Sequence, residues 1–324
     1  MTPDGSTPCL ETVPSLENET DRFRVDVLTG LAASPKHLSP KYFYDATGSR
    51  LFDAICDLPE YYLTRAELSI IEAHASSIVA SWGTRVRVVE PGAGSGTKTR
   101  LLLRALGRER CLEYAPLDIA RDHLAGAAER IRADIPWLRV VAVAADFTQE
   151  LPLASAENTV VYFPGSTIGN FEPREAQRLL ARFARAAGPS GQVVLGVDLK
   201  KDPSVLHAAY NDARGVTAAF NKNLLVRMNR ELGADFDVDA FAHHAFYEPV
   251  LGRIEMHLVS LRRQTVKVGH RRFDFADGET LHTECSYKYD LARAESLARA
   301  AGLRLADTWL DEGRRFAVLS LRPD

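Results

Sequence analysis

Residues 85–107 read RVRVVEPGAGSGTKTRLLLRALG, and this stretch indicates the fold class of the 324-residue chain. A β-branched run over residues 85–90 is followed by a glycine-rich loop, and the loop is followed by a helical pattern of apolar residues. Strand, glycine loop and helix in this order form the first unit of an α/β fold.

The same alternation continues on both sides of this unit. A helix is predicted over residues 66–82, and strands and helices then alternate as far as residue 198. The further strands are predicted at 113–118, 140–146, 159–165 and 192–198, with helices at 120–134 and 173–188. Valine-rich strands joined by helices predict a doubly wound, mostly parallel sheet that binds its ligand at the carboxyl ends of the strands.

The pattern changes after Asp198. Residues 204–232 are helical in pattern and residues 253–287 read as antiparallel strands, whereas a helix at 289–302 and a hairpin at 303–322 return to the first sheet. We therefore predict a core of residues 21–199 plus 287–324 and an α+β substrate-binding insertion at 200–286. Residues 1–20 are polar and are expected to be a disordered N-terminus.

Composition excludes several classes of partner. The chain has 40 Lys+Arg and 43 Asp+Glu, a formal charge of −3, so no overall positive field attracts nucleic acid. It has no run of 18 apolar residues and no basic and apolar leader, which argues against a membrane protein or a secreted one. Four scattered cysteines fit a reducing cytoplasm. We expect a monomer that binds a small molecule.

The glycine loop points to a nucleoside ligand. Gly92, Gly94 and Gly96 form a G-x-G-x-G pattern, with Glu90 before it and Thr97 where a dinucleotide-binding loop has Gly or Ala. A carboxylate at Glu90 suits a positively charged ligand better than a pyrophosphate. The alternative is a tight turn that binds nothing.

Two further acids end strands of the same sheet. Asp118 ends one strand, and Asp146, followed by Phe147, ends the next. An acid about 20 residues after the loop is placed for ribose hydroxyls, and an Asp-Phe pair can bind and cover a base. Each acid alone would more simply cap the following helix. Together with Glu90, Gly92 and Gly94, these residues predict S-adenosylmethionine (SAM) rather than NAD.

Several longer segments resemble the histidine-specific Nα-methyltransferases of the ergothioneine pathway. The resemblance extends from about residue 22 to the C-terminus. It is carried by PKYFYDATGSRLFDAICDLPEYYLTR (40–65), FPGSTIGNFEP (163–173), VDLKKDPSVLHAAYNDARGVTAAFNKNLL (197–225) and LHTECSYKY (281–289). It implies a class I methyltransferase core that transfers three methyl groups from SAM to the α-amine of L-histidine, giving hercynine.

The resemblance also implies site residues. It assigns Gly92, Lys98, Asp118, Asp146 and Phe147 to the cofactor. For the amino acid it implies Tyr61, Asn170, Tyr210, Glu284 and Ser286. The chain departs from the family at Pro91-Gly92-Ala93-Gly94, where members often have L-G-S-G or F-G-S-G. Because Pro91 lacks an N–H, hydrogen bonding in this loop is expected to differ.

The substrate residues have a physical rationale. Glu284 and Ser286 lie two apart on a predicted strand, so their side chains share one face and Cys285 points to the other. A carboxylate and a hydroxyl can pair with the two nitrogens of an imidazole. Met256 is a candidate for lining the ring pocket, although core packing is its simpler role. Tyr61 and Asn170 are assigned to catalysis, because methyl transfer depends mainly on positioning an unprotonated amine.

Other functions remain open at this stage. The nearest alternative is a SAM-dependent N-methyltransferase for another amino acid, such as tryptophan or tyrosine. A SAM-binding regulator without activity and an NAD-dependent oxidoreductase are the other classes. Nine histidines occur without HExxH or convergent Cys/His spacing, so no metal is predicted.

Overall fold

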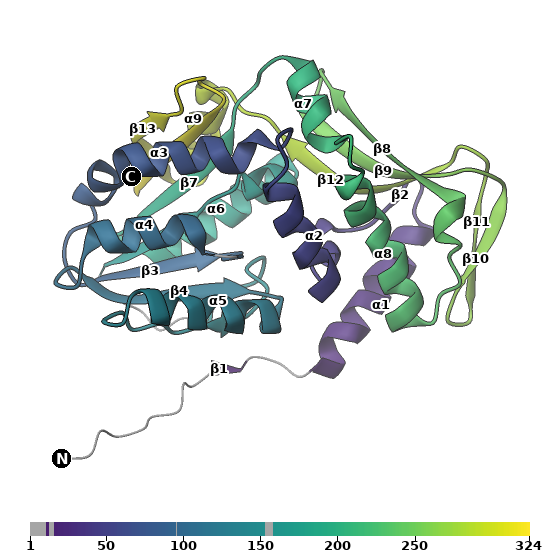
Figure 1. Cartoon of the computed structure of the whole chain (residues 1–324), viewed down its shortest axis with the longest axis horizontal. Helices are drawn as coiled ribbons and strands as arrows, with labels where there is room; N and C mark the ends of the chain where they lie inside the picture. The colour runs from purple at the N-terminus through teal and green to yellow at the C-terminus, as the bar shows by residue number, and fades with distance from the viewer. Residues whose placement is uncertain (1–10, 13–15, 95, 153–157) are drawn as a thin grey trace.

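The computed structural model describes residues 11–12, 16–94, 96–152 and 158–324. Its larger unit contains an eight-stranded sheet in the order β1-β5-β4-β3-β6-β7-β14-β13 (Figure 1). The strands are β1 (Glu11–Thr12), β5 (Val143–Ala144), β4 (Cys111–Asp118), β3 (Val86–Pro91), β6 (Thr159–Phe163), β7 (Gln192–Asp198), β14 (Phe316–Pro323) and β13 (Leu303–Leu310). All pairs from β1 to β7 are parallel, and β14 is antiparallel to β7 and β13. The predicted fold class, including the antiparallel end, is confirmed.

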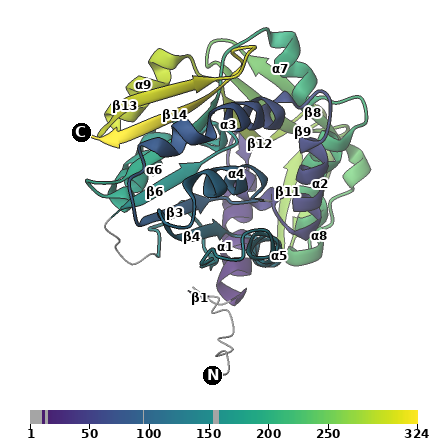
Figure 2. The ribbon, with the colours of Figure 1, turned by 60° about the vertical axis from the view of Figure 1, so that its left-hand side comes forward.

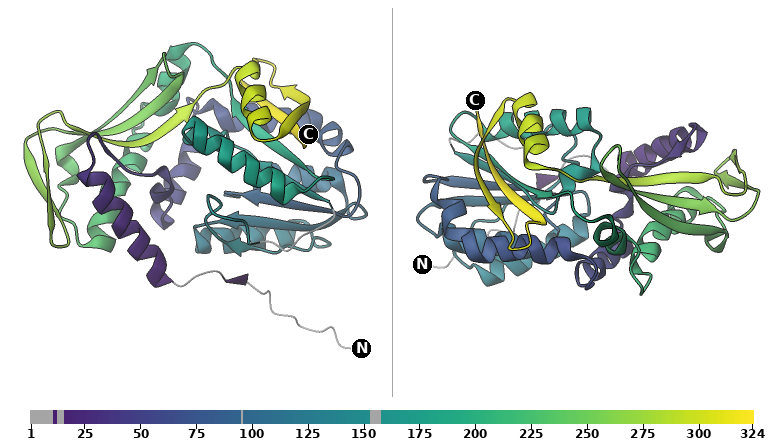
Figure 3. Two further views of the ribbon diagram at one scale, coloured as in Figure 1. Left: turned by 180° about the vertical axis from the view of Figure 1, so that it is seen from behind. Right: turned by 90° about the horizontal axis from the view of Figure 1, so that it is seen from above.

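Helices cover both faces of this sheet. On one face lie α3 (Tyr62–Ala80), α4 (Thr97–Leu106) and α5 (Arg121–Asp134), and on the other lie α6 (Pro173–Ala187) and α9 (Leu291–Ala300) (Figures 2 and 3). Successive strand residues alternate between the two cores. Val88 packs in the core under the first set of helices and Val89 in the core under the second, as the two-residue period of a strand requires.

The smaller unit is built on a four-stranded sheet in the order β2-β12-β9-β8. Its strands are β2 (Lys36–His37), β12 (Thr280–Tyr287), β9 (Arg253–Ser260) and β8 (Phe241–Glu248), and a separate hairpin joins β10 (Gln264–Val268) to β11 (Arg271–Phe275). The remaining helices are α1 (Leu16–Ala32), α2 (Ala46–Cys56), α7 (Pro203–Tyr210) and α8 (Val216–Leu232), with 3-10 turns η1 (Pro40–Phe43), η2 (Thr167–Asn170) and η3 (Val238–Ala240). The antiparallel strands expected within residues 253–287 are present, and β8 is an additional one.

The N-terminal segment that includes α1, β2 and α2 contacts the smaller unit, and the prediction from sequence places residues 21–199 in the core. β2 pairs in parallel with β12, placing Lys36 beside Leu281, and α1 and α2 both pack against α8. In Figure 1, α2 lies on the side of α8 that faces the large sheet, and α1 lies next to the lower end of α8. Local patterning cannot reveal this arrangement, because the partner residues lie about 200 positions later in the chain.

Most of the segment expected to be disordered, residues 1–20, lies outside the described residues. Of that segment the structure describes β1 and the beginning of α1 at Leu16. Within the described ranges, no helix has both the length and the apolar character needed to cross a membrane.

Candidate active site

A cavity of about 1380 Å³ has walls from both units. The larger unit contributes the loops that follow β3, β4, β5 and β6, which are the carboxyl ends of neighbouring parallel strands. The smaller unit contributes residues from α2 and from β12. A ligand at the edge of the parallel sheet is therefore within reach of side chains from the smaller unit.

The glycine loop leaves its backbone open to the cavity. Gly92, Gly94 and Gly96 all have positive φ, at 69°, 50° and 68°, which glycine adopts without strain. A Cβ at Gly92 would lie 3.4 Å from the Phe147 ring. The N–H of Gly92 donates to the carbonyl of Leu117 at 2.7 Å, which ties the loop to the end of β4.

Glu90 is a buried carboxylate at the end of β3, and it lines the cavity. Its Oε2 accepts hydrogen bonds from the hydroxyls of Thr99, at 2.6 Å, and Tyr114. Burial raises the pKa of Glu90 to about 7, and the two hydroxyls oppose this shift. A nearby positive charge would favour the ionised form of this side chain.

Asp118 and Asp146 hold their own loops as well as facing the cavity. Oδ1 of Asp118 accepts from the Ala120 N–H at 2.9 Å, and Oδ1 of Asp146 accepts from the Thr148 N–H at 2.9 Å. Burial raises the pKa of Asp118. Oδ2 of Asp146 lies 3.6 Å from the ammonium of Lys41. The capping role and the ligand role of these acids are thus compatible.

All seven residues predicted to bind the cofactor line the cavity, namely Glu90, Gly92, Gly94, Lys98, Asp118, Asp146 and Phe147. Lys98 differs from the others, because its ammonium pairs with Oε2 of Glu67 at 2.5 Å. Glu67 is fully buried and also accepts the Gly165 N–H at 2.9 Å. The charge of Lys98 is therefore already balanced within the protein.

Tyr61 and Asn170 also line the cavity. Tyr61 precedes α3, and Asn170 is the last residue of η2, immediately after the turn that follows β6. Among the hydrogen bonds of the described residues, none involves the Tyr61 hydroxyl or the Asn170 carboxamide. Both polar groups therefore remain able to bind a ligand.

Tyr210, Glu284, Ser286 and Met256 are not among the residues that line the cavity, and all four are buried. The Tyr210 ring contacts the Tyr61 ring edge to face, with centroids 6.4 Å apart. The Tyr210 hydroxyl donates to Ser286 Oγ at 2.8 Å. Met256 is paired with Glu284 across β9 and β12 and is 1% exposed, so its observed role is core packing.

Glu284 differs from its neighbours because its carboxylate is buried without a hydrogen-bond donor among the described residues. Burial raises its pKa to about 7, and the ammonium of Lys288 opposes the shift. Cys285 points to the other face of β12, with Sγ 4.0 Å from the Gly169 carbonyl oxygen, as predicted from strand geometry.

Two parts of this site were missed from sequence. Tyr44 lies on the cavity wall and contacts the Phe52 ring edge to face, at 5.6 Å. Its neighbour Tyr42 is instead buried, with its hydroxyl bonded to Asp26 at 2.5 Å. Both tyrosines stand in the quoted segment 40–65, but nothing local distinguishes the one that faces the cavity. The second part is the buried ion pair of Asp198 and Lys288, at 2.9 Å.

Comparison with known proteins identifies the family of this chain. A family model described as histidine-specific methyltransferase, SAM-dependent, matches residues 23–323. The histidine N-alpha-methyltransferase of Mycolicibacterium smegmatis is 41% identical over 93% of this chain and 95% of that protein. The protein of the same name from Mycobacterium tuberculosis is 42% identical over 91% and 93%. Ergothioneine biosynthesis protein 1 of Neurospora crassa is 28% identical over 85% of this chain and 32% of that protein. The chain belongs to the SAM-dependent, histidine-specific methyltransferases.

Proposed function

We propose that this enzyme transfers methyl groups from SAM to the α-amino nitrogen of L-histidine and continues to the trimethylated betaine, hercynine. The observation that carries the proposal is the buried Glu284 carboxylate, which lacks a donor in the described structure and lies close to the cavity residue Tyr61 through Tyr210. A buried acceptor of this kind is costly to leave unpaired, so a ligand with an N–H group is favoured there.

The donor half of the cavity fits SAM. The bare backbone at Gly92 leaves space that a Cβ would narrow against Phe147. Glu90 supplies a negative charge near the loop, and Asp118 and Asp146 supply acceptors for ribose and base groups. SAM provides a methyl group on a positively charged sulfur that departs as a neutral thioether. The residues around it therefore have to bind and orient rather than to activate.

Positioning of the amine is assigned to Asn170 and Tyr61. The carboxamide of Asn170 offers an acceptor for an amine N–H and a donor for the substrate carboxylate. The Tyr61 hydroxyl offers a second contact on the same wall. Only the unprotonated amine can attack, and each of the first two transfers releases a proton, which passes to solvent through the cavity. Alignment of nitrogen, methyl and sulfur then supplies most of the rate enhancement.

Selectivity for histidine is assigned to Glu284 and Ser286. The carboxylate accepts from one imidazole N–H, and the Ser286 hydroxyl meets the other ring nitrogen. Pockets built to satisfy polar groups discriminate more strongly than pockets built on volume. A methyltransferase for tryptophan or tyrosine is disfavoured, because the indole N–H or the phenol O–H could pair with the carboxylate but neither ring has a second nitrogen for the Ser286 hydroxyl.

The proposed reaction belongs to ergothioneine biosynthesis in the cytoplasm. The name of the Neurospora crassa relative supports the pathway. The free cysteines Cys56, Cys111 and Cys285 are consistent with a reducing compartment.

Mass spectrometry tests the proposal directly. Purified protein is incubated with SAM and a mixture of the common amino acids, and the methylated product is identified. We expect histidine alone to gain one, two and then three methyl groups on the α-nitrogen. Methylation of an imidazole nitrogen would mean that the amino acid lies reversed in the site, and methylation of tryptophan or tyrosine would overturn the assigned substrate.

A further inference from the structure

A row of histidines crosses the four-stranded sheet on the face turned away from Ser286 and Tyr210. His37 on β2 is paired with His282 on β12, His282 with His257 on β9, and His257 with His244 on β8. Residues in register on adjacent strands project to the same face. The His257 and His282 rings are in contact, with centroids 4.9 Å apart.

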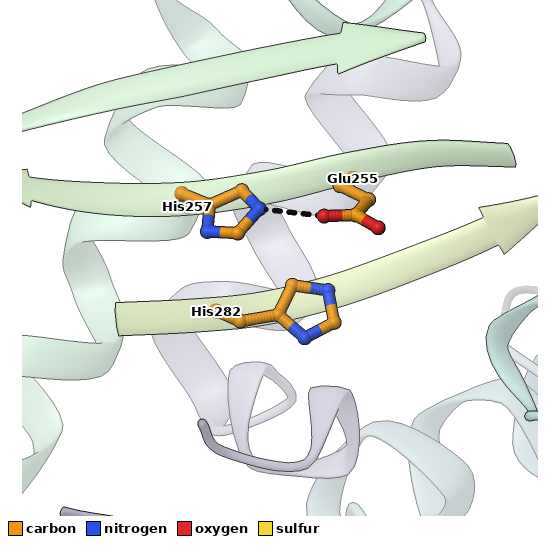
Figure 4. Close-up of side chains that lie close together, drawn as sticks. All are labelled: Glu255, His257 and His282. Atoms are coloured by element: carbon orange, nitrogen blue, oxygen red, sulfur yellow. Dashed lines mark hydrogen bonds and ion pairs between the residues drawn. The ribbon is translucent and has the colours of Figure 1, made fainter. Parts of the chain in front are cut away.

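Glu255 joins the two central histidines of this row. Glu255, His257 and His282 each offer one ligand atom, and these three atoms lie within 4.8 Å of one another (Figure 4). Nε2 of His257 is 2.9 Å from Oε2 of Glu255. Their side chains are 12% and 14% exposed, so the cluster is largely withdrawn from solvent.

We propose that Glu255, His257 and His282 form a binding site for a divalent first-row transition metal, with zinc as the test ion. Two imidazoles and one carboxylate are a protein ligand set that zinc accepts, with water completing the coordination. Hard cations such as Mg²⁺ prefer all-oxygen sites and are not expected to bind here. The proposal is independent of methyl transfer, since none of the three residues is assigned to that reaction.

The surroundings of the cluster fit a ligand role. Nε2 of His282 lies 2.9 Å from the Glu284 carbonyl oxygen, an anchor of the kind that metal-binding histidines have on one ring nitrogen. Nε2 of His257 faces Glu255, and its buried Nδ1 has no hydrogen-bond partner in the described part of the chain, so this ring lacks the anchor that His282 has.

The charges around the cluster and its access to solvent set the expected affinity for a metal ion. The guanidinium of Arg253 binds Oε1 of Glu255 at 2.5 and 2.8 Å, so Oε2 remains for an ion while the positive charge weakens its binding. His282 lines the large cavity, which gives an ion a path from solvent. The sequence contains no recognisable metal motif here, because the ligands come from two strands that are separated in the chain.

Calorimetric titration of Zn²⁺ into a chain without a histidine tag tests the site. We expect one tight equivalent, with Mg²⁺ giving no signal. His257→Gln and His282→Gln should each weaken zinc binding by at least about 10-fold. Even the loss of a residue that only hydrogen-bonds to a metal ligand has an effect of this size. His270→Gln, at an exposed position in the β10–β11 turn, is the control and should leave zinc binding unchanged.

Two further measurements keep the test decisive. Retained SAM binding shows that each variant is folded. If a histidine variant fails to fold, Glu255→Gln replaces a proposed ligand with a side chain of the same shape. Co²⁺ bound at this site with a low coordination number should give intense visible absorption bands. The variants should lose these bands. No stoichiometric zinc binding, or binding that the ligand variants leave intact, would overturn the proposal.

Discussion

At the scale of single residues, Glu90 and Glu284 show how one side-chain type can take two roles. Burial raises the pKa of both to about 7. Glu90 already accepts from the hydroxyls of Thr99 and Tyr114, whereas Glu284 has no donor among the described residues. The Glu284 carboxylate oxygens therefore remain available to accept a hydrogen bond from a ligand N–H.

The first prediction concerns the kinetics of Glu284→Gln. Because the wild-type carboxyl has a pKa of about 7, its ionised fraction falls about tenfold per pH unit below that value. At saturating SAM, kcat/KM for histidine should therefore fall more steeply there than protonation of the substrate alone would cause. The variant should lose about tenfold in kcat/KM at pH 8, since a charge-assisted hydrogen bond becomes neutral. The acid limb of the variant should retain only the titrations of the substrate, those of its α-amine and its imidazole, which steady-state kinetics across pH will measure.

Asp118→Asn is the matched control for this experiment. It should raise KM for SAM and leave the preference among amino acids unchanged, because Asp118 lies at the sheet edge assigned to the donor. Wild-type kinetics for histidine in Glu284→Gln would show that the imidazole is recognised elsewhere.

The second prediction concerns stability in the absence of ligands. The pKa of Glu284 is raised, so the folded chain holds this proton more tightly than the unfolded chain, and the associated stability is lost as pH rises through about 7. Glutamine is neutral throughout. Glu284→Gln should therefore be about 2 kcal/mol more stabilising at pH 8 than at pH 5. Urea unfolding at the two pH values measures the difference, and an equal effect at both would contradict the assigned pKa.

At the scale of elements, the junction of the glycine loop with α4 is fixed by backbone conformation. Gly96 is the N-cap of α4, with φ 68° and ψ 11°. A Cβ there would lie 2.6 Å from Cδ1 of Ile131 on α5. The glycine therefore permits both the left-handed conformation and the close packing of α4 beside α5, which hold the loop open toward the cavity.

The third prediction compares two N-cap glycines. Gly215, the N-cap of α8, has nearly the same conformation, with φ 71° and ψ 19°, but no atom lies within 4 Å of a Cβ built there. Gly215→Ala should cost about 1 kcal/mol from backbone strain alone. Gly96→Ala should cost up to about 1 kcal/mol more, because the terminal methyl group of the buried Ile131 must move, and should weaken SAM binding. Chemical unfolding and calorimetry measure both effects, and equal destabilisation would exclude the contact with Ile131 as the cause.

At the scale of the whole molecule, a buried ion pair joins the two units. Asp198 ends β7 of the large sheet and Lys288 follows β12 of the small sheet, and both are fully buried. The Tyr62 hydroxyl donates to Asp198 at 2.8 Å, and the Lys288 ammonium donates to Tyr210 and Ser286 at 3.0 and 2.8 Å. The hydroxyls assigned to the substrate are thus fixed relative to the donor sheet.

The fourth prediction is that Lys288→Met lowers the free energy of unfolding by about 3 kcal/mol, because Asp198 loses a buried partner. This is the lower end of the usual cost, since Lys201 also contacts Asp198, at 2.5 Å. The variant should raise KM for histidine more than KM for SAM. The double variant Asp198→Asn with Lys288→Met should recover part of the lost stability. Denaturant unfolding of the wild type, the two single variants and the double variant tests this prediction. If the losses of unfolding free energy are additive, Asp198 and Lys288 are not directly coupled.

Local sequence patterns were enough to predict the features that depend on neighbouring residues. The parallel sheet and the sheet edge that binds the cofactor could both be predicted in this way. They follow from the valine-rich strand Val86–Val89, the glycines after β3 and the acids at the strand ends, and each of these patterns involves only a few neighbouring residues. The tertiary structure alone decided which distant segments meet. It placed β2 beside β12, turned Tyr44 rather than Tyr42 toward the cavity, paired Asp198 with Lys288 and brought Glu255, His257 and His282 together. These contacts depend on strand register and on burial between segments far apart in the chain, which no local period encodes.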